Sequence, residues 1–350
     1  MVDLARKLAA IVFSAAALSG CGGSSVPAVR SVPPPDSPLR PDLKTQGCIS
    51  PPCIYVANSS KLFHRGSITV YRYGANGNVS PVERIAGTKT GLQNPSGVAL
   101  DSSRNIYVSN FFGEYGGSVT EYAAGSNGNV SPVRTIDNAP SGRYLMVGVA
   151  DVVIDSAGYI FVPANDSNSV SVYAPDANGD APPARYIQGG KTEMHDASYV
   201  AVTKDGTIYV PNYLGDSVTI FGRRADGNVA PIRMIAGSQT KLRGCSGLGI
   251  DSKGNIYVSN YNTNSVAVFD KHANGNVAPI AIIAGSATGI NGPDSMTVDA
   301  KDNVYVSNTG AQNGGSVTVY AKGATGNVAP IATITGSKTM IDAPAGLVVQ

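Results

Sequence analysis

The sequence predicts an all-β fold: a six-bladed β-propeller made of four-stranded antiparallel blades. Three observations predict it. A phrase of the type Ile-Tyr-Val-Ser-Asn returns six times, each copy is followed by further short β-type segments, and the aromatic residues of successive copies lie 52, 54, 48, 48 and 48 residues apart. Repeats of this length that hold four strands are typical of propeller blades. A linear solenoid of six hairpin pairs is the alternative, but it leaves the terminal strands unexplained.

Four segments of each repeat predict strands, because they are short and rich in β-branched and aromatic residues. In one repeat they lie at 97–101, 106–110, 118–122 and 132–136. Many are apolar at both alternating sets of positions, as expected when both faces of a sheet are covered. Asn-Gly-Asn at 76–78 and its equivalents predict tight hairpin turns, because Asn-Gly supplies positive φ.

The two ends of the repeat region predict a closed ring. The first repeat begins at its second strand, at Ile54, and the chain stops at 346–350, which matches the missing first strand. The C-terminal strand is therefore expected to become the innermost strand of the blade begun at Ile54. This arrangement of one strand with three removes a loose sheet edge.

The first twenty residues predict a lipoprotein signal peptide. Arg6 and Lys7 precede an apolar run over 8–18 that is too short to span a bilayer. The run ends in Leu18-Ser19-Gly20-Cys21, which resembles the bacterial lipobox. The resemblance implies cleavage before Cys21 and fatty-acyl chains, such as palmitate, on its thiol and its new amine. Several acyl chains give stable membrane anchoring. In the lipoproteins that this motif resembles, an Asp directly after the lipidated cysteine implies retention in the inner membrane. Gly22 at this position therefore implies the outer membrane.

The chain is expected to consist of a signal peptide (1–20), a lipidated cysteine with a Pro-rich tether (21–47) and the propeller (48–350). Six prolines between 27 and 41 predict a semi-extended spacer. The expected location is therefore the bacterial cell envelope, periplasmic or surface-exposed. The net charge of +2 gives no indication of the basic surface that nucleic-acid binding needs, so no nucleic-acid partner is expected.

Three phrases of the repeat carry a family resemblance. NHL-type repeats of bacterial envelope propellers are resembled, over 54–350, by Pro95-Ser96-Gly97-Val98-Ala99-Leu100-Asp101, Asn105-Ile106-Tyr107-Val108-Ser109-Asn110 and Ser118-Val119-Thr120. Such propellers include binding scaffolds, and related ones include gluconolactonase-like hydrolases and streptogramin lyase. The resemblance therefore implies the fold, and leaves the function open.

A binding surface is expected on the face that carries the loops between blades and between second and third strands. The loops of the blades around 304, 54 and 106 are the longest. They form an expected crescent, and two polar inter-blade loops lie on the other half of the face. Exposed aromatics beside polar groups suit sugar, lipid or protein contact, although long loops are also common surface filler. The expected binding residues are Phe63, His64, Arg65, Phe111, Phe112, Tyr115, His195, Asp196 and Arg243, with Glu114 in the same crescent.

Few residues in the sequence are suited to catalysis. The three histidines lie far apart in the repeat pattern, so no metal site and no cofactor are expected. Asp101 and its equivalents at the end of the innermost strand are expected to accept backbone N–H groups in a turn. The Asn that ends each second strand (Asn58, Asn110, Asn212, Asn260, Asn308) is expected to cap the following loop. A ring of amides that binds a polar ligand is the alternative.

The cysteines have separate expected roles. Cys21 is the lipidation site. Cys48 and Cys53 are predicted to form a disulfide in an oxidising compartment, pinning the start of the first strand. Cys245 is expected to be buried and inert.

Three functions are compatible with this pattern. The first is a non-catalytic binding module for an envelope protein or glycan, held at the membrane by its N-terminal lipid. The second is a metal-dependent hydrolase or lyase of the gluconolactonase-like type, which would need three or more acidic, amide or imidazole side chains at one channel mouth. The third is a structural or adhesive module.

Overall fold

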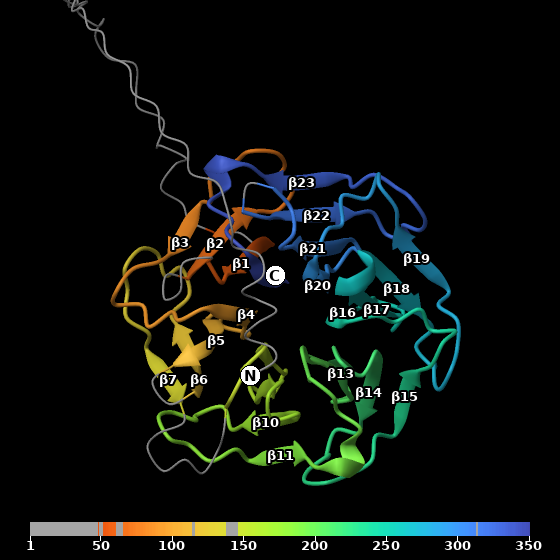
Figure 1. The fold of residues 1–350 in the computed structure, drawn as a ribbon. Helices are drawn as coiled ribbons and strands as arrows, with labels where there is room; N and C mark the ends of the chain where they lie inside the picture. Colours follow the sequence, from red (N-terminus) through yellow and green to blue (C-terminus); the bar gives the residue numbers. More distant parts are fainter. Residues whose placement is uncertain (1–47, 49–51, 61–65, 114–115, 138–145, 313) are drawn as a thin grey trace, which may run out of the picture. The chain divides into compact units, whose positions relative to one another are not determined.

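Six four-stranded antiparallel sheets surround a central axis in the part of the chain that the structure describes (Figure 1). The structure is a computed structural model that describes residues 48, 52–60, 66–113, 116–137, 146–312 and 314–350. The prediction of an all-β, six-bladed propeller is confirmed. Helical structure in these residues is limited to three short 3-10 turns, η1 (Gly190–Thr192), η2 (Tyr261–Thr263) and η3 (Ser337–Thr339). None of the described helices is long and apolar enough to cross a membrane.

The blades follow one another along the chain. Blade 1 contains β24 (Pro344–Val349), β1 (Cys53–Asn58), β2 (Ser67–Arg72) and β3 (Glu83–Ile85). Blade 2 contains β4 (Pro95–Leu100), β5 (Ile106–Gly113), β6 (Gly116–Tyr122) and β7 (Arg134–Asp137). Blade 3 contains β8 (Val153–Ile154), β9 (Ile160–Ala164), β10 (Ser169–Tyr173) and β11 (Arg185–Gln188).

The second half of the ring repeats this order. Blade 4 contains β12 (Ala201–Val202), β13 (Ile208–Asn212), β14 (Ser217–Phe221) and β15 (Arg233–Ala236). Blade 5 contains β16 (Cys245–Ile250), β17 (Ile256–Asn260), β18 (Ser265–Phe269) and β19 (Ala281–Ala284). Blade 6 contains β20 (Pro293–Val298), β21 (Val304–Asn308), β22 (Ser316–Tyr320) and β23 (Ala332–Thr335).

The antiparallel order gives the ring two different faces. We call the face with the connections between blades and between second and third strands the upper face. The lower face carries the connections from first to second and from third to fourth strands. Because every blade has the same strand order, equivalent residues of all six blades lie on the same face.

The first and last described strands meet in blade 1. β24 pairs antiparallel with β1, with Val348 opposite Tyr55 and Leu347 opposite Val56. The Cys53 and Gln350 main chains exchange two further hydrogen bonds, at 2.8 and 3.1 Å. The C-terminal strand is thus the innermost strand of the blade that the N-terminal strands complete, and it leaves no unpaired inner edge there.

The sequence pattern predicts that the Asn-Gly-Asn segments are simple hairpin turns. The structure shows that they also make contacts between blades. Each one reaches the outermost strand of the preceding blade and pairs with it in a parallel bridge, for example Gly128 with Ile85 and Gly179 with Ile136. The equivalent bridge between Gly77 and Ile334 joins blade 1 to blade 6. We call these segments hooks. Their glycines have φ between 61° and 81°, which explains why glycine is needed.

The hydrophobic core is divided among the seams between blades. Each cluster of buried residues draws on two neighbouring blades, such as Val70 and Ile85 of blade 1 with Val98 and Ile106 of blade 2. The central strands are buried along their whole length, as in β1 and β17. Both sheet faces are therefore covered by the neighbouring blades.

Candidate functional site

Two of the predicted crescent residues form an aromatic pair on the upper face. Phe111 and Phe112 lie at the end of β5, and their rings meet edge to face with centroids 4.9 Å apart. Their main-chain N–H groups donate to the carbonyls of Asn94 and Gln93, so this loop is tied to the segment that precedes β4. Both side chains are half-buried. This pair offers a fixed apolar surface at the upper end of blade 2.

The predicted polar residues hold loops of neighbouring blades together. Arg243 Nη1 lies 3.1 Å from Asp216 Oδ2, and the N–H of Gly244 donates to Asp216 Oδ1 at 2.7 Å. The N–H of Asp196 donates in the same way to the side chain of Asn168, one blade earlier. Asp216 and Asn168 both have positive φ at the connection between second and third strands. Arg243 and Asp196 thus take part in contacts that join the loops of neighbouring blades.

His195 lies in the same inter-blade loop as Asp196 and is exposed. Its N–H donates to Asn212 Oδ1 at 3.1 Å. The remaining predicted upper-face residues, Phe63, His64, Arg65, Glu114 and Tyr115, lie outside the described residues. The same holds for the predicted lipidation site Cys21.

A second aromatic pair on the upper face was not predicted from the sequence. Tyr213 and Tyr261 approach with ring centroids 6.0 Å apart, and the Tyr213 hydroxyl donates to Asn262 Oδ1 at 3.4 Å. Leu214 beside them is 65% exposed. A sequence signal for this pair exists: Phe111, Tyr213 and Tyr261 each directly follow the Asn that ends the second strand. The upper face therefore carries aromatic residues at the same position in blades 2, 4 and 5.

The five Asn residues that end the second strands are buried and have a structural role. Asn110 Oδ1 accepts the N–H of Gln93 at 3.0 Å, and its Nδ2 donates to Ser118 and Thr120. Asn212 makes the same contacts with His195, Ser217 and Thr219. These amides fix the loop that leads into the inner strand. Their polar atoms are occupied by the protein, which supports the capping role over the amide ring.

A polar group is buried where the inner strands approach the axis. The third residue of each inner segment is glycine in blades 1, 2 and 5, whereas blades 3, 4 and 6 have Asp151, Tyr199 and Ser295. The Ser295 hydroxyl donates to the Tyr199 hydroxyl at 2.9 Å, although the two residues belong to blades 4 and 6. Tyr199 therefore extends past blade 5 to reach blade 6.

Asp151 is fully buried and incompletely paired. Its Oδ2 accepts the N–H of Val200 at 3.4 Å, while its Oδ1 has no hydrogen-bond partner among the described residues. Burial raises the pKa of the Asp151 carboxyl well above its usual value. Burial, and then the nearby Asp151 carboxylate, also raise the pKa of Tyr199.

Other chemically interesting groups are structural. Asp101, Asp155, Asp251 and Asp299 accept backbone N–H groups within their turns on the lower face, as predicted from the sequence. Cys245 is buried, and burial raises the pKa of its thiol. Among the described residues, no three His, Cys, Asp or Glu side chains are grouped so that they could hold a metal ion.

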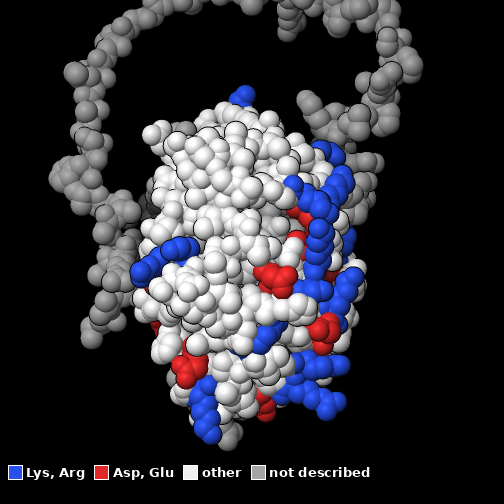
Figure 2. All heavy atoms as spheres, turned by 90° about the vertical axis from the view of Figure 1, so that its right-hand side faces the viewer, with Lys and Arg blue, Asp and Glu red and all other residues white. Residues whose placement is uncertain are grey.

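Exposed cations gather on the lower face of blades 4–6. They lie in the connections of these blades, and Figure 2, which looks at this side of the ring, shows Lys and Arg concentrated along one edge. The exposed cations are Lys204, Arg223, Arg224, Lys253, Lys271, Lys301 and Lys322. The exposed acids of the same connections are Asp205, Asp226 and Asp270.

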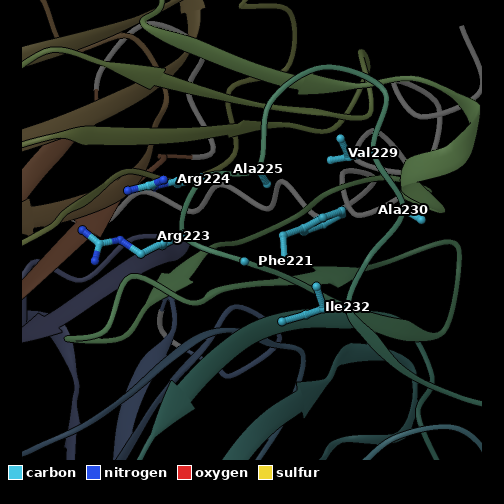
Figure 3. Close-up of a pocket in the computed structure, with 8 residues that line it drawn as sticks. Phe221, Arg223, Arg224, Ala225, Val229, Ala230 and Ile232 are labelled. Atoms are coloured by element: carbon cyan, nitrogen blue, oxygen red, sulfur yellow. The ribbon is translucent and has the colours of Figure 1, made fainter.

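A shallow apolar pocket lies at the outer lower rim of blade 4. It has a volume of about 480 Å³ and is lined by Phe221, Val229 and Ile232 together with Arg223 and Arg224. Figure 3 shows the apolar side chains on one side, while the side chains of Arg223 and Arg224 start at the opposite rim and point away from them. The pocket thus combines an apolar surface with two cations.

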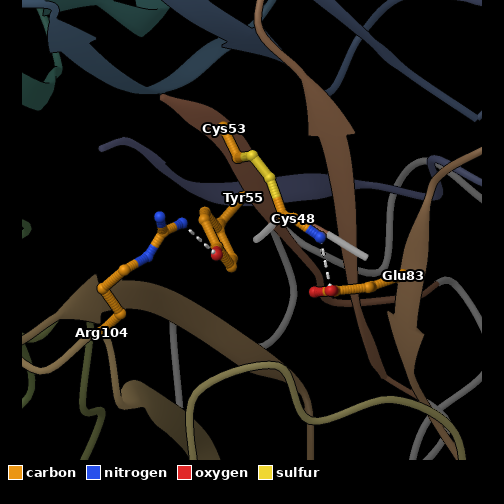
Figure 4. Close-up of a disulfide and its surroundings, with 5 residues drawn as sticks. All are labelled: Cys48, Cys53, Tyr55, Glu83 and Arg104. Carbon is orange, nitrogen blue, oxygen red and sulfur yellow. Dashed lines mark hydrogen bonds between the residues drawn. A yellow bond between two sulfur atoms is a disulfide. The ribbon is translucent and has the colours of Figure 1, made fainter. Parts of the chain in front are cut away.

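The chain joins the propeller at the lower end of blade 1. A disulfide links Cys48 to Cys53 at the start of β1, with Cα atoms 6.3 Å apart (Figure 4). The N–H of Cys48 donates to Glu83 Oε1 at 2.6 Å. Glu83 occupies the position where blades 2–4 have Arg134, Arg185 and Arg233, which reach carbonyls of the next blade. Blade 1 has the hydrogen-bond acceptor Glu83 at this position instead, and Glu83 binds the main chain of Cys48, which precedes β1.

Known proteins share the fold of this chain at low sequence identity. No protein-family model matches the chain. The comparison with curated proteins also finds no match. Among solved structures, a nidogen/laminin complex is similar with a TM-score of 0.57 and 12% identity, over 85% of this chain and 97% of that one. A candidate 6-phosphogluconolactonase from Bacteroides fragilis is similar with a TM-score of 0.57 and 14% identity, over 89% of this chain and 100% of that one.

A third similar structure comes from Lactobacillus plantarum, with a TM-score of 0.56, 13% identity and coverage of 85% and 99% of the two chains. At these identities the likeness establishes the propeller fold alone.

Proposed function

We propose that this chain is a lipid-anchored protein of the bacterial cell envelope whose propeller, built from NHL-like repeats, binds a protein or glycan through its upper face without catalysis. The upper-face aromatic surface carries this proposal. It consists of Phe111 and Phe112 in blade 2 and of Tyr213, Leu214 and Tyr261 in blades 4 and 5. Partly exposed aromatic side chains beside polar groups are typical of sugar and protein contacts.

The attachment of the chain supports the same choice of face. Cys48 and Cys53 fix the arriving chain at the lower end of blade 1, opposite the upper-face aromatic surface. A tether that leaves from the lower face allows the upper face to point away from the membrane. The outer membrane is the proposed location, with Cys21 as the lipidated residue.

A binding screen on the whole chain in detergent tests the proposed binding. Sugars and peptidoglycan fragments are added, and the unfolding midpoint is recorded. A ligand at one hundred times its Kd stabilises the folded state by about 2.7 kcal/mol. The variants Phe111→Ala with Phe112→Ala, and Tyr213→Ala with Tyr261→Ala, should remove the shift. The matched control Tyr159→Ala changes a tyrosine of the lower face that is 37% exposed, and should keep it. A shift that survives both upper-face variants would exclude this surface.

Hydrolysis of a lactone is the second candidate function. It is favoured by one observation, the structural similarity to the candidate 6-phosphogluconolactonase, at 14% identity. Its test is a hydrolysis assay on gluconolactone and its 6-phosphate, with and without added divalent cations. Turnover above the spontaneous rate, lost on adding a chelator, would replace the binding proposal with this one.

Lipidation is tested separately. Cells that express the chain are grown with labelled palmitate, and the protein is then isolated. We expect label in the unsubstituted chain and none in the variant Cys21→Ala. Label that persists in the variant would exclude Cys21 as the acylated residue.

A further inference from the structure

We propose that the lower face of blades 4–6 is a membrane-contact surface that binds the headgroups of anionic phospholipids. The proposal rests on the lipid anchor proposed above and adds the orientation of the propeller at the membrane. It is carried by a pattern that recurs in three consecutive blades, in which an exposed isoleucine lies beside exposed cations.

The isoleucines begin the outermost part of each blade at equivalent positions. Ile232, Ile280 and Ile331 are 63%, 60% and 59% exposed, although they are large apolar residues. Each directly follows a proline, and its N–H donates to the third strand of its own blade, as Ile232 does to Ile220. The side chains are thus held outward by a fixed backbone. Apolar groups presented in this way insert into the boundary between headgroups and acyl chains.

Cations accompany each isoleucine in the connection between third and fourth strands. Arg223 and Arg224 belong to blade 4, Lys271 to blade 5 and Lys322 to blade 6. Blade 2 has an exposed Val133 at the isoleucine position but no cation in 123–132. The combination is therefore particular to one half of the ring.

Two acids of this half are held inward, whereas Asp205, Asp226 and Asp270 are exposed and are outnumbered by the seven exposed cations. Asp302 is buried and accepts hydrogen bonds from the Ser252 main chain and from Lys322 Nζ. Asp299 is buried and accepts from its own turn and from the Tyr73 hydroxyl. Because these acids are occupied within the protein, the outermost charges of this surface are mostly cations (Figure 2). Such cations are attracted to a surface of anionic lipids.

The pocket at blade 4 provides a place for a single lipid. Phe221, Val229 and Ile232 can receive part of an acyl chain. Arg223 and Arg224 lie at the rim, with side chains that point outward, where they suit a phosphate group beside the pocket (Figure 3). The chain joins blade 1 on this same lower face, next to blade 6. The described chain therefore enters the propeller on the same face that carries the membrane-contact surface.

Vesicle binding of the full-length chain tests the proposal. The background is Cys21→Ala, so that acylation does not contribute. Two triple variants with the same change of net charge are compared. The lower-face variant is Arg223→Glu, Arg224→Glu and Lys271→Glu, and the upper-face control is Lys191→Glu, Lys241→Glu and Lys338→Glu, all at exposed positions. Vesicles consist of phosphatidylcholine, or of equal parts phosphatidylcholine and phosphatidylglycerol.

We expect the background chain to prefer the anionic vesicles, the lower-face variant to lose at least about tenfold in partitioning to them, and the control to stay within about twofold. High salt should weaken the preference. Circular dichroism confirms that both variants are folded. Equal losses in both variants, or no preference for anionic vesicles in the background chain, would overturn the proposal. A second variant, Ile232→Ser with Ile280→Ser and Ile331→Ser, should weaken binding without changing the charge.

The lipid anchor is tested by a separate comparison on neutral vesicles. The unsubstituted chain should bind neutral vesicles, and Cys21→Ala should abolish that binding. Failure of this arm concerns the anchor, whereas the comparison of the two charge variants concerns the lower face.

Discussion

Asp151 is a carboxyl group that the fold buries without completing its hydrogen bonds. Its Oδ1 lies against Gly97, where a Cβ would come within 2.4 Å of it, and no described group donates to that oxygen. An ionised carboxylate in such a position is costly, so burial raises the pKa of the Asp151 carboxyl. The stability of the propeller therefore depends on pH through this residue.

The variant Asp151→Asn should remove that dependence. The folded protein holds the Asp151 proton more tightly than the unfolded chain. Its contribution is therefore complete below the unfolded pKa near 3.8 and is lost as pH rises from there toward the raised folded pKa. Asn has no proton to lose. Urea unfolding of both proteins between about pH 5 and 8 should show the variant gaining relative stability, by up to about 1.4 kcal/mol per pH unit. A difference that is constant across this range would contradict the raised pKa.

Single residues differ in how far their roles can be predicted from the sequence. The recurring Asp and Asn residues repeat at fixed positions, and their roles in turns and caps follow from local hydrogen bonding. Tyr199 of blade 4 and Ser295 of blade 6 meet past the intervening blade 5. That contact depends on the closure of the ring, which no local pattern encodes.

The hooks act at the level of the connecting segments. Asn78 Oδ1 accepts the N–H of Lys338 at 2.7 Å, and Asn129 Oδ1 accepts that of Lys89 at the same distance. Each of these Asn side chains also packs against a glycine with positive φ in the neighbouring blade, Gly336 and Gly87. The hooks thus fasten each blade to the one before it, including blade 1 to blade 6.

Asn78→Ala should destabilise the propeller by about 1 kcal/mol, because one hydrogen bond between blades is lost. Asn129→Ala should cost about the same, since the contact is repeated. Ser80→Ala, at an exposed position two residues after Asn78, is the control and should leave the unfolding free energy unchanged within about 0.5 kcal/mol. Urea unfolding measures all three. A loss in Ser80→Ala equal to that in Asn78→Ala would argue against the hook.

The disulfide at the start of β1 can be checked by peptide mapping. Without reductant, the peptide that contains Cys48 and Cys53 should be lighter by two hydrogens than after reduction, and Cys245 should be alkylated only on unfolding. Cys48→Ser with Cys53→Ser should speed proteolysis near residue 48 while the blades stay resistant, because the bridge closes only a short loop. Detection of two free thiols at 48 and 53 would exclude the bridge.

The segment patterns predicted strands well and connections less well. Strands such as β17 and β21 can be recognised because short runs of β-branched and aromatic residues, apolar at both alternating sets of positions, reflect burial on both faces. The pattern Asn-Gly-Asn indicates a glycine with positive φ, which the structure has, but not the strand on which it will pack. The partner of each hook belongs to another blade, about forty residues earlier in the sequence, except that Gly77 of blade 1 pairs with Ile334 near the C-terminal end of the ring.

The whole ring requires close approach of the inner strands. A Cβ on Gly346 would lie 2.6 Å from Gly97 Cα, so blades 1 and 2 meet backbone to backbone at the axis. Gly346→Ala should therefore destabilise the protein by about 1–3 kcal/mol. Gly222→Ala is the matched control, because nothing lies within 4 Å of its Cβ position. Equal unfolding midpoints for the two variants in urea would contradict the close packing.

The architecture of the whole molecule was predictable, whereas the binding surface was predictable only in part. Six repeats and a matching C-terminal segment were sufficient to predict six blades. Phe111 and Phe112 were found because their loop is long, but Tyr213 and Tyr261 lie in short loops and become visible only when repeats are aligned by their strand-terminal Asn.

The hooks also determine how such a protein can be taken apart and recombined. Each blade is held by the hook of the next blade along the chain. A blade that is transplanted with only its own four strands therefore lacks the hook that holds it. Chimeras between propellers of this type should therefore be joined after the hook of the following blade, near Gly128 or Gly179, rather than at the conventional blade boundary. The structural unit of this ring is therefore a blade together with the hook of the next blade.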